Sequence, residues 1–331
     1  MLTKRQNLVE TIRGGNPDRY VNQFEFLSLL GGNPYSARTV CPAKGGGPVK
    51  NQWGITTSFP AGVPAPFPVH DQAHIVIKDI EDWKLYVKAP NLLFPEEEWE
   101  PYVLAAEAVD RREYFAAPVI APGIFEQCHY LMEIQNCMVS LVTNPDEMHE
   151  LIDYITQWQL QYAEQLCKYL KPDAIFLHDD WGSQLSSFMS PNLFEEFLEP
   201  AYTALYGYYK SHGVELIVHH SDSYAANLVP SMIRMGIDIW QGVMSTNDIP
   251  ELIKKYGGRI TFMGGIDSGR IDRADWTREN IRAVAERACR ECGARYFIPC
   301  STMGGPESIF PGVYDTLTEE IHRISKAYFP Y

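Results

Sequence analysis

From about residue 116 onward, the chain alternates short apolar runs with longer segments in which apolar residues have helical spacing. The runs have the length and bounding residues of buried strands. The predicted strands are Pro118–Ala121, Ala174–Leu177, Val214–Val218, Ile237–Trp240, Ile260–Met263 and Tyr296–Ile298, with an earlier one at Tyr20–Phe24. Such alternation is typical of parallel strands joined by crossover helices. Seven strands are counted and an eighth is inferred. The prediction is an α/β fold of the (β/α)8 TIM barrel type, with a doubly wound open sheet as the alternative.

The length and composition predict a single barrel domain over residues 1–331. The chain has 331 residues, of which 45% are hydrophobic and 21% charged, enough to bury the core of one such barrel. Residues 31–70 are rich in glycine and proline. We interpret this stretch, and more broadly residues 31–115, as an irregular insertion or lid over one end of the domain.

The charge of the chain excludes several classes of partner. A formal net charge of -14 and a pI near 5.1 repel phosphate backbones and anionic lipids, so we expect no nucleic acid and no membrane partner. The first residues lack the apolar core of a secretory signal, which predicts a cytoplasmic protein. Seven scattered cysteines predict reduced thiols. The sequence leaves open whether the chain forms a homodimer.

Polar residues follow five of the predicted strands, in the segments 178–184, 219–222, 241–242, 264–267 and 299–302. In a barrel of parallel strands, the carboxyl ends of the strands converge at one mouth, where catalytic groups stand. These segments supply histidines, carboxylates, amides and a thiol. They therefore predict an enzyme active site at this mouth.

Four motifs resemble the uroporphyrinogen decarboxylase superfamily, and the resemblance covers nearly the whole chain. They are His178-Asp-Asp-Trp-Gly-Ser-Gln184 followed by Met189-Ser-Pro191, then Val218-His-His-Ser-Asp222, Gly257-Gly-Arg-Ile-Thr-Phe-Met-Gly-Gly-Ile-Asp267, and Pro299-Cys300. The resemblance implies a TIM barrel enzyme. That superfamily contains decarboxylases and also corrinoid-dependent zinc methyltransferases, among them the methyltransferase components of O-demethylases.

The start of the chain favours the methyltransferase branch. The decarboxylases carry Met-Arg-Gln-Ala-Gly-Arg-Tyr here, and its arginines hold the carboxylates of the porphyrinogen. This sequence instead reads Arg19-Tyr-Val-Asn-Gln-Phe-Glu-Phe26, which lacks those guanidinium clamps. Decarboxylation, methyl transfer from a methylcorrinoid to a thiol, and a non-catalytic binding protein are kept as alternatives.

The resemblance implies a zinc site built around His220 and Cys300. Asp222 stands where these enzymes have a first cysteine, and zinc also accepts carboxylate oxygen. Asp222 could instead orient His220 from behind, as metal-bound imidazoles commonly require. Glu199 precedes His220 at the spacing found in some aryl ether demethylases, and it is a further candidate ligand. Adjacent residues of a strand face opposite ways, so only one of His219 and His220 can face into the barrel. The resemblance selects His220.

Other residues near the predicted strand ends are candidates for catalysis and substrate binding. Asp179 and Asp180 follow a buried strand directly, so we expect one of them to reach the mouth. Asp267 could do likewise or could cap a helix. The candidate catalytic residues are Asp179, Asp180 and Asp267, and the candidate substrate-binding residues are Phe24, Trp181, Gln184 and Gln241.

The expected activity is transfer of a methyl group from a small donor to the Co(I) corrinoid of a separate protein. The expected donor is an aryl methyl ether, and zinc would act as a Lewis acid on the ether oxygen. The sequence contains no Asp-x-His-x-x-Gly segment of the kind that binds cobalamin. A corrinoid-carrying partner protein is therefore expected.

Overall fold

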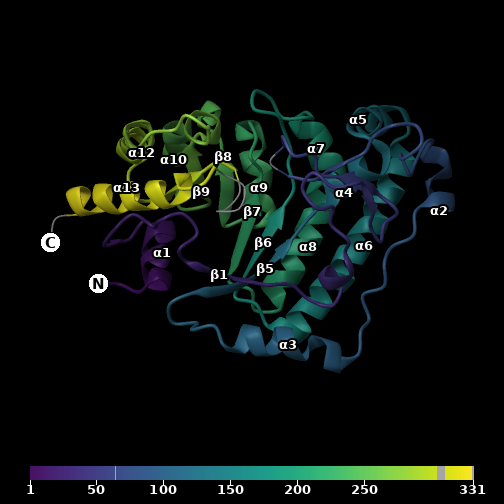
Figure 1. Cartoon of the computed structure of the whole chain (residues 1–331), viewed down its shortest axis with the longest axis horizontal. Helices are drawn as coiled ribbons and strands as arrows, with labels where there is room; N and C mark the ends of the chain where they lie inside the picture. The colour runs from purple at the N-terminus through teal and green to yellow at the C-terminus, as the bar shows by residue number, and fades with distance from the viewer. Residues whose placement is uncertain (64, 304–309, 330–331) are drawn as a thin grey trace.

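Seven parallel strands form the centre of the molecule in a computed structural model, which describes residues 1–63, 65–303 and 310–329 (Figure 1). The strands are β1 (Leu27–Leu30), β5 (Phe115–Ile120), β6 (Ala174–His178), β7 (Leu216–His220), β8 (Ile239–Val243), β9 (Thr261–Ile266) and β10 (Phe297–Ser301). Their order in the sheet is their order in the chain, and every neighbouring pair is parallel. This barrel-like α/β arrangement confirms the predicted fold class.

The segment before β1 bridges the gap between the first and last strands of the sheet. The amide of Gln23 donates to the carbonyl of Pro299 in β10 over 3.3 Å, and the amide of Phe115 in β5 donates to the carbonyl of Phe26 over 2.9 Å. No eighth strand of the central sheet occurs in the parts of the chain that the structure describes. The inferred eighth strand is therefore replaced by this irregular segment.

The predicted early strand at Tyr20–Phe24 was misplaced, because that stretch forms a turn and the strand begins at Leu27. Gln23 has a φ of 52°, which no extended strand adopts. Asn22 and Glu25 close the turn, since each accepts a hydrogen bond from the backbone amide of the other. Tyr20 and Val21 are buried and Phe24 is half-buried, and none of them joins the sheet ladder.

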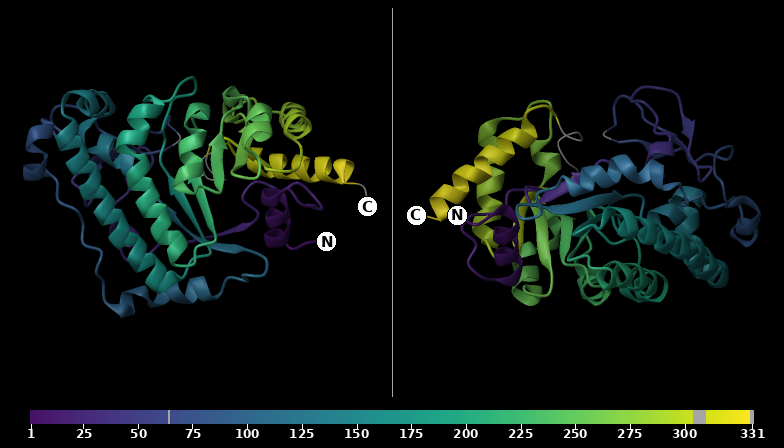
Figure 2. Two further views of the ribbon diagram at one scale, coloured as in Figure 1. Left: turned by 180° about the vertical axis from the view of Figure 1, so that it is seen from behind. Right: turned by 90° about the horizontal axis from the view of Figure 1, so that it is seen from below.

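Helices cover the outside of the sheet, and both termini lie at the same end of the molecule (Figures 1 and 2). They are α1 (Lys4–Arg13), α4 (Ile124–Met132), α5 (Ile134–Thr143), α6 (Pro145–Leu170), α7 (Pro191–Phe197), α8 (Glu199–Ser211), α9 (Val229–Met235), α10 (Ile249–Tyr256), α11 (Ser268–Ile271), α12 (Arg278–Cys292) and α13 (Val313–Tyr328). The N-terminal segment is tied to α13, since the amide of Tyr20 donates to Ser325 and the side chain of Asn22 donates to the carbonyl of Thr318.

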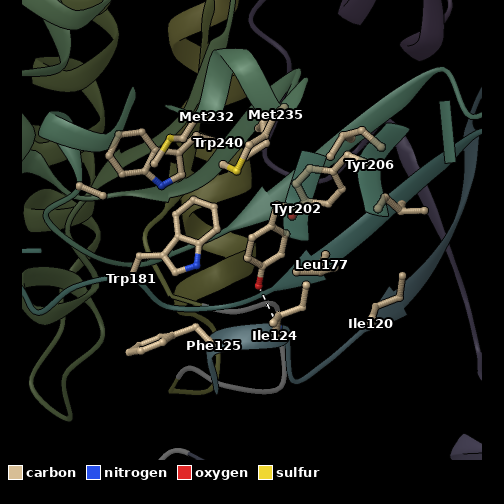
Figure 3. Close-up of a cluster of buried hydrophobic side chains, with 14 of the residues drawn as sticks. Ile120, Ile124, Phe125, Leu177, Trp181, Tyr202, Tyr206, Met232, Met235 and Trp240 are labelled. Atoms are coloured by element: carbon tan, nitrogen blue, oxygen red, sulfur yellow. Dashed lines mark hydrogen bonds between the residues drawn. The ribbon is translucent and has the colours of Figure 1, made fainter. Parts of the chain in front are cut away.

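Alternation along the strands divides the core into two clusters. Outward-facing residues pack under the helices, and Figure 3 shows part of this outer cluster, with Trp181, Tyr202 and Trp240 among its members. The inner cluster fills the lower part of the barrel and consists of Leu8, Val21, Phe26, Leu27, Phe115, Ala117, Ala174, Leu216, Val218, Ile239, Met263, Ile298 and Cys300. Because Leu8 belongs to α1, that helix closes the end of the barrel opposite the strands' carboxyl ends.

The chain between β1 and β5 contains a small antiparallel sheet and three short helical elements before a longer helix. The elements are η1 (Ser36–Arg38), β2 (Val49–Lys50), β3 (Thr56–Ser58), β4 (Phe67–Pro68), η2 (Ile80–Asp82), α2 (Trp83–Tyr86) and α3 (Glu96–Glu107). Trp53 packs edge-on against Trp158 of α6, with ring centroids 5.1 Å apart. The amide of Ile77 donates to the carbonyl of Leu131 in α4 over 2.9 Å. This segment therefore packs along α4 and α6.

All seven cysteines are free thiols, as predicted. Of the helices in the described ranges, none combines the length and the apolar character that a bilayer crossing demands.

Candidate functional site

Strand register brings three polar side chains together on the inner face of the sheet. His178 pairs with His220 across β6 and β7, and His220 pairs with Gln241 across β7 and β8. His220 lies two residues after Val218 of the inner cluster, so it faces inward. His219 faces outward and stacks on Trp181 at 3.8 Å between ring centroids. The prediction that His220 is the histidine that faces into the barrel is confirmed.

His178, Asp180 and His220 form a group that could hold a metal ion. One potential ligand atom from each lies within 4.8 Å of the others. The Nε2 atom of His220 is 3.9 Å from Oδ1 of Asp180, and the two imidazole rings stack with centroids 4.4 Å apart. The group lies at the carboxyl ends of β6 and β7, which is where barrels of this type place their reactive groups.

Two neighbouring side chains fix the orientation of the histidines. The Nδ1 atom of His178 lies 2.9 Å from Oε2 of Glu126 in α4, and Nδ1 of His220 lies against Oε1 of Gln241. Carboxylate and amide oxygens are acceptors, so each imidazole donates from Nδ1. The lone pair on Nε2 of each ring is then available to a metal ion. Such an arrangement is typical of metal-bound histidine.

A bound cation would stabilise the charged form of the carboxyl groups around this group. The carboxylates of Glu126, Asp180 and Asp222 surround it, and the amide of Asp222 donates to Asp180 over 2.9 Å. Within the described residues, no lysine or arginine forms an ion pair with any of these three. Burial raises the pKa of Glu126 and of Asp222, and the nearby Asp180 raises that of Asp222 further.

The two histidines respond to this environment differently. Burial lowers the pKa of His220, and the neighbouring His178 lowers it further. Burial also opposes charge on His178, but the Glu126 carboxylate outweighs this effect and raises the pKa of His178. The cluster thus combines the neutral imidazole of His220, the ring of His178, whose Nε2 proton a metal ion would displace, and carboxylate oxygen in a mostly buried place. Zinc accepts both kinds of donor, so the residues present fit a zinc ion.

Asp179 was predicted to be catalytic, but its side chain holds α4 in place. Its carboxylate accepts hydrogen bonds from the backbone amides of Phe125 and Glu126 at 3.0 and 2.7 Å, from the indole of Trp181 at 3.1 Å, and from the hydroxyl of Tyr202. It is completely buried. Of the two adjacent carboxylates, Asp180 is therefore the one that reaches the mouth.

The structure also shows where three other candidate residues lie. Trp181 is completely buried in the outer cluster, where it lies beside Tyr202 (Figure 3), so it faces away from the barrel mouth. Gln184 lies in an exposed loop, where its carbonyl accepts a hydrogen bond from Thr246. Asp267 caps α11, as the alternative interpretation held, through a 3.0 Å bond from the amide of Gly269.

The structure does not bring Glu199 or Cys300 into the group formed by His178, Asp180 and His220. Both carboxylate oxygens of Glu199 accept hydrogen bonds from Arg234 at 2.7 Å, a pairing that joins α8 to α9. Cys300 is completely buried in the inner cluster, and burial raises the pKa of its thiol to about 12. Its sulfur contacts Gln241, which occupies the Nδ1 side of His220 and not the Nε2 side.

Gln241 and Phe24 lie beside the group. The side chain of Gln241 lies between His220 and Cys300. The Nε2 atom of Gln241 is 4.0 Å from the sulfur of Cys300. Phe24 packs edge-on against Phe176 at 5.9 Å, and the ring of Phe176 lies 6.0 Å from that of His220. Substrate binding by Phe24 and Gln241, and ligation by Asp222, stay predictions.

Sequence reasoning did not assign His178 and Glu126 to the site. His178 ends β6 two residues after the inward-facing Phe176, so strand alternation was a signal for it. Glu126 lies in the first turn of α4 and reaches His178 only because the loop after β5 turns that helix over the mouth. No local pattern in the sequence indicates this contact.

The sequence matches the uroporphyrinogen decarboxylase (URO-D) family over residues 51–323, which is most of the chain. The protein therefore belongs to this family, and the metal-ligand group lies at the mouth of a URO-D-type barrel. No protein with curated annotation matches the chain in sequence.

Solved structures share the fold at low sequence identity. A methyltransferase from Methanosarcina mazei superposes with a TM-score of 0.68 at 14% identity, covering 98% of this chain and 99% of that one. A B12-independent methionine synthase from Shewanella sp. W3-18-1 gives a TM-score of 0.44 at 14% identity, covering 81% of this chain and 73% of that one. The first similarity supports the barrel-like fold over the full length.

Proposed function

We propose that this protein is a zinc-dependent methyltransferase that moves a methyl group from an aryl methyl ether to the Co(I) corrinoid of a partner protein. The observation that carries the proposal is the group of His178, Asp180 and His220 at the mouth of a URO-D-type barrel. The fold shared with the Methanosarcina mazei methyltransferase gives it further support.

In this proposal His178, Asp180 and His220 hold the zinc ion, and neighbouring side chains fix the orientation of the two imidazole rings. Glu126 fixes the ring of His178, and Gln241 fixes that of His220, so that neither imidazole must reorient on binding. When bound, zinc supplies a Lewis acid that stabilises the charge developing on the ether oxygen.

The reaction breaks the bond between the methyl carbon and the ether oxygen. The electron pair of Co(I) forms the new bond to the methyl carbon, and the phenolate leaves with the pair of the broken bond and later takes a proton from water. Phe24 and Phe176 provide the apolar surface beside His220 on which the ring would rest. The open mouth of the barrel would admit the methyl acceptor.

The test combines metal analysis with a methyl transfer assay. We would measure zinc in the wild type and in the variants His178→Ala, His220→Ala and Asp180→Asn, with His149→Ala as control. His149 is also a histidine paired with a glutamate, Glu196 at 3.7 Å, but it lies on the surface. Each protein would then be mixed with a methoxylated aromatic and a reduced corrinoid protein, and formation of methylcobalt would be followed by absorbance.

We expect about one zinc per wild-type chain, loss of zinc and of methyl transfer in the three site variants, and no change in His149→Ala. Zinc retained by all three site variants would refute the ligand assignment. Bound zinc without turnover of any methoxylated aromatic would refute the donor class. Loss of a carboxyl group from a substrate by the metal-free protein would instead favour the decarboxylase alternative.

A further inference from the structure

Two apolar side chains on the inner face of the sheet are exposed. Leu29 follows Leu27 on β1 with the same orientation, and Val119 follows Ala117 on β5 likewise. Leu27 and Ala117 belong to the buried inner cluster, whereas Leu29 is 50% exposed and Val119 is 44% exposed. In a barrel filled by side chains, residues at inward-facing positions would be buried. The barrel is therefore open above its inner cluster on this side.

The two residues form one surface. Leu29 pairs with Ala117 across β1 and β5, and Val119 is the next inward-facing residue along β5. Single exposed apolar residues are common on proteins and need no explanation. These two differ because they are neighbours and lie on the concave face of the sheet.

This surface is continuous with the wall of the metal-ligand group. Val119 pairs with Phe176 across β5 and β6. The ring of Phe176 is 5.9 Å from that of Phe24 and 6.0 Å from that of His220. We call the surface formed by Phe24, Leu29, Val119 and Phe176 the apolar shelf. It borders the group formed by His178, Asp180 and His220.

The shelf itself is apolar over all of its members. Phe24, Leu29, Val119 and Phe176 carry no polar side-chain group. Contact with such a surface removes apolar area of a ligand from water, which favours binding of a ring over a small polar ligand. A flat aromatic ring therefore suits this surface.

From these contacts we infer that the apolar shelf binds the aromatic ring of the methyl donor and favours methoxylated aromatics over small methyl ethers that lack a ring. This inference rests on the proposed function for the identity of the reaction, but it concerns binding alone. The ether oxygen of a ring lying on the shelf faces the metal-ligand group. Val119 and Leu29 then determine specificity without taking part in the chemistry.

Calorimetric binding of 2-methoxyphenol and of 2-methoxyethanol, which has no ring, to the zinc-loaded protein at neutral pH tests the inference. We expect 2-methoxyphenol to bind at least tenfold more tightly. Val119→Ser removes two methyl groups from the shelf and should weaken 2-methoxyphenol about fivefold to tenfold. The control is Val142→Ser, because Val142 is a valine on the outer helix α5 with 72% exposure. It should leave binding unchanged.

A second variant places a charge on the shelf. Val119→Lys should weaken binding of 2-methoxyphenol more than that of 2-methoxyethanol, because the ring loses its apolar contact surface. Equal behaviour of Val119→Ser and Val142→Ser, tighter binding of 2-methoxyethanol by the wild type, or no binding of either compound would overturn the inference. Binding that follows the shelf without methyl transfer to Co(I) corrinoid would refute the proposed function and leave the shelf intact.

Discussion

Replacing Glu126 by glutamine tests whether the carboxylate behind His178 contributes to metal binding. The side chain of Glu126 is almost completely buried and accepts a 2.9 Å hydrogen bond from Nδ1 of His178. Glutamine keeps an acceptor oxygen at this place and removes the negative charge. The variant therefore separates the effect of charge from that of shape.

The expected magnitude follows from the kind of hydrogen bond. A bond to a charged partner contributes about 1.5–3 kcal/mol, whereas a neutral one contributes about 1 kcal/mol. The difference is on the order of 1.4 kcal/mol, which corresponds to about a tenfold loss in zinc affinity. Glu126→Ala removes the bond altogether and should approach the hundredfold upper range for residues that support a metal ligand.

Competition with a chromogenic zinc chelator measures these affinities directly. The matched control is Glu196→Gln, since Glu196 faces His149 at 3.7 Å in an exposed pair on the surface. We expect the control to bind zinc as the wild type does. Glu126→Gln and Glu126→Ala with wild-type affinity would contradict the claim that His178 binds zinc through Nε2 with Glu126 behind it.

Three further variants test other parts of the structure. Asp179→Asn should lower the free energy of unfolding by about 2–4 kcal/mol in denaturant titrations. The carboxylate of Asp179 accepts four hydrogen bonds, one of them from Tyr202, and the amide of asparagine cannot accept all four. Unchanged stability would refute the structural role of Asp179. Cys300→Ser should keep its zinc, and metal loss on analysis would restore this thiol as a ligand. Hydrogen bonds from Arg282 and two other arginines lower the pKa of the buried Glu320 to about 2, whereas the pKa of glutamate in the unfolded chain is about 4.3. The charged Glu320 therefore contributes its full stabilisation above about pH 4.3, and this contribution is lost as the pH falls towards about 2. Glu320→Gln should therefore cost about 2 kcal/mol at pH 7 and progressively less in acid, as urea titrations at several pH values would show; a cost independent of pH would contradict this.

The strands of the second part of the chain could be predicted from the sequence because they are apolar and buried on both faces. Each of the six strands from β5 to β10 overlaps a predicted one. The strand expected at Tyr20–Phe24 was misplaced because its apolar residues are buried by a turn. Burial alone does not distinguish a turn packed on a core from a strand within it.

Only those parts of the site that lie on strands could be predicted, because there the alternation of side chains indicates which residues face inward. Alternation shows that only one of His219 and His220 faces inward, and the family resemblance selects His220. Alternation from the inward-facing Phe176 also indicates His178. Asp179 and Asp180 are adjacent carboxylates, and only tertiary contacts with α4 decide which one is buried under it. Glu126 enters the site from a helix more than 50 residues before His178, so no local pattern could reveal it.

The central claim is that a zinc ion is held by imidazole and carboxylate groups and not by a thiolate. X-ray absorption at the zinc edge of the loaded protein tests it most directly, because zinc lies about 2.0–2.1 Å from nitrogen and oxygen ligands and about 2.3 Å from sulfur. We expect a shell of nitrogen and oxygen only, with imidazole scattering that is lost in His178→Ala and His220→Ala. A sulfur neighbour near 2.3 Å, or a zinc signal that neither variant alters, would contradict the account.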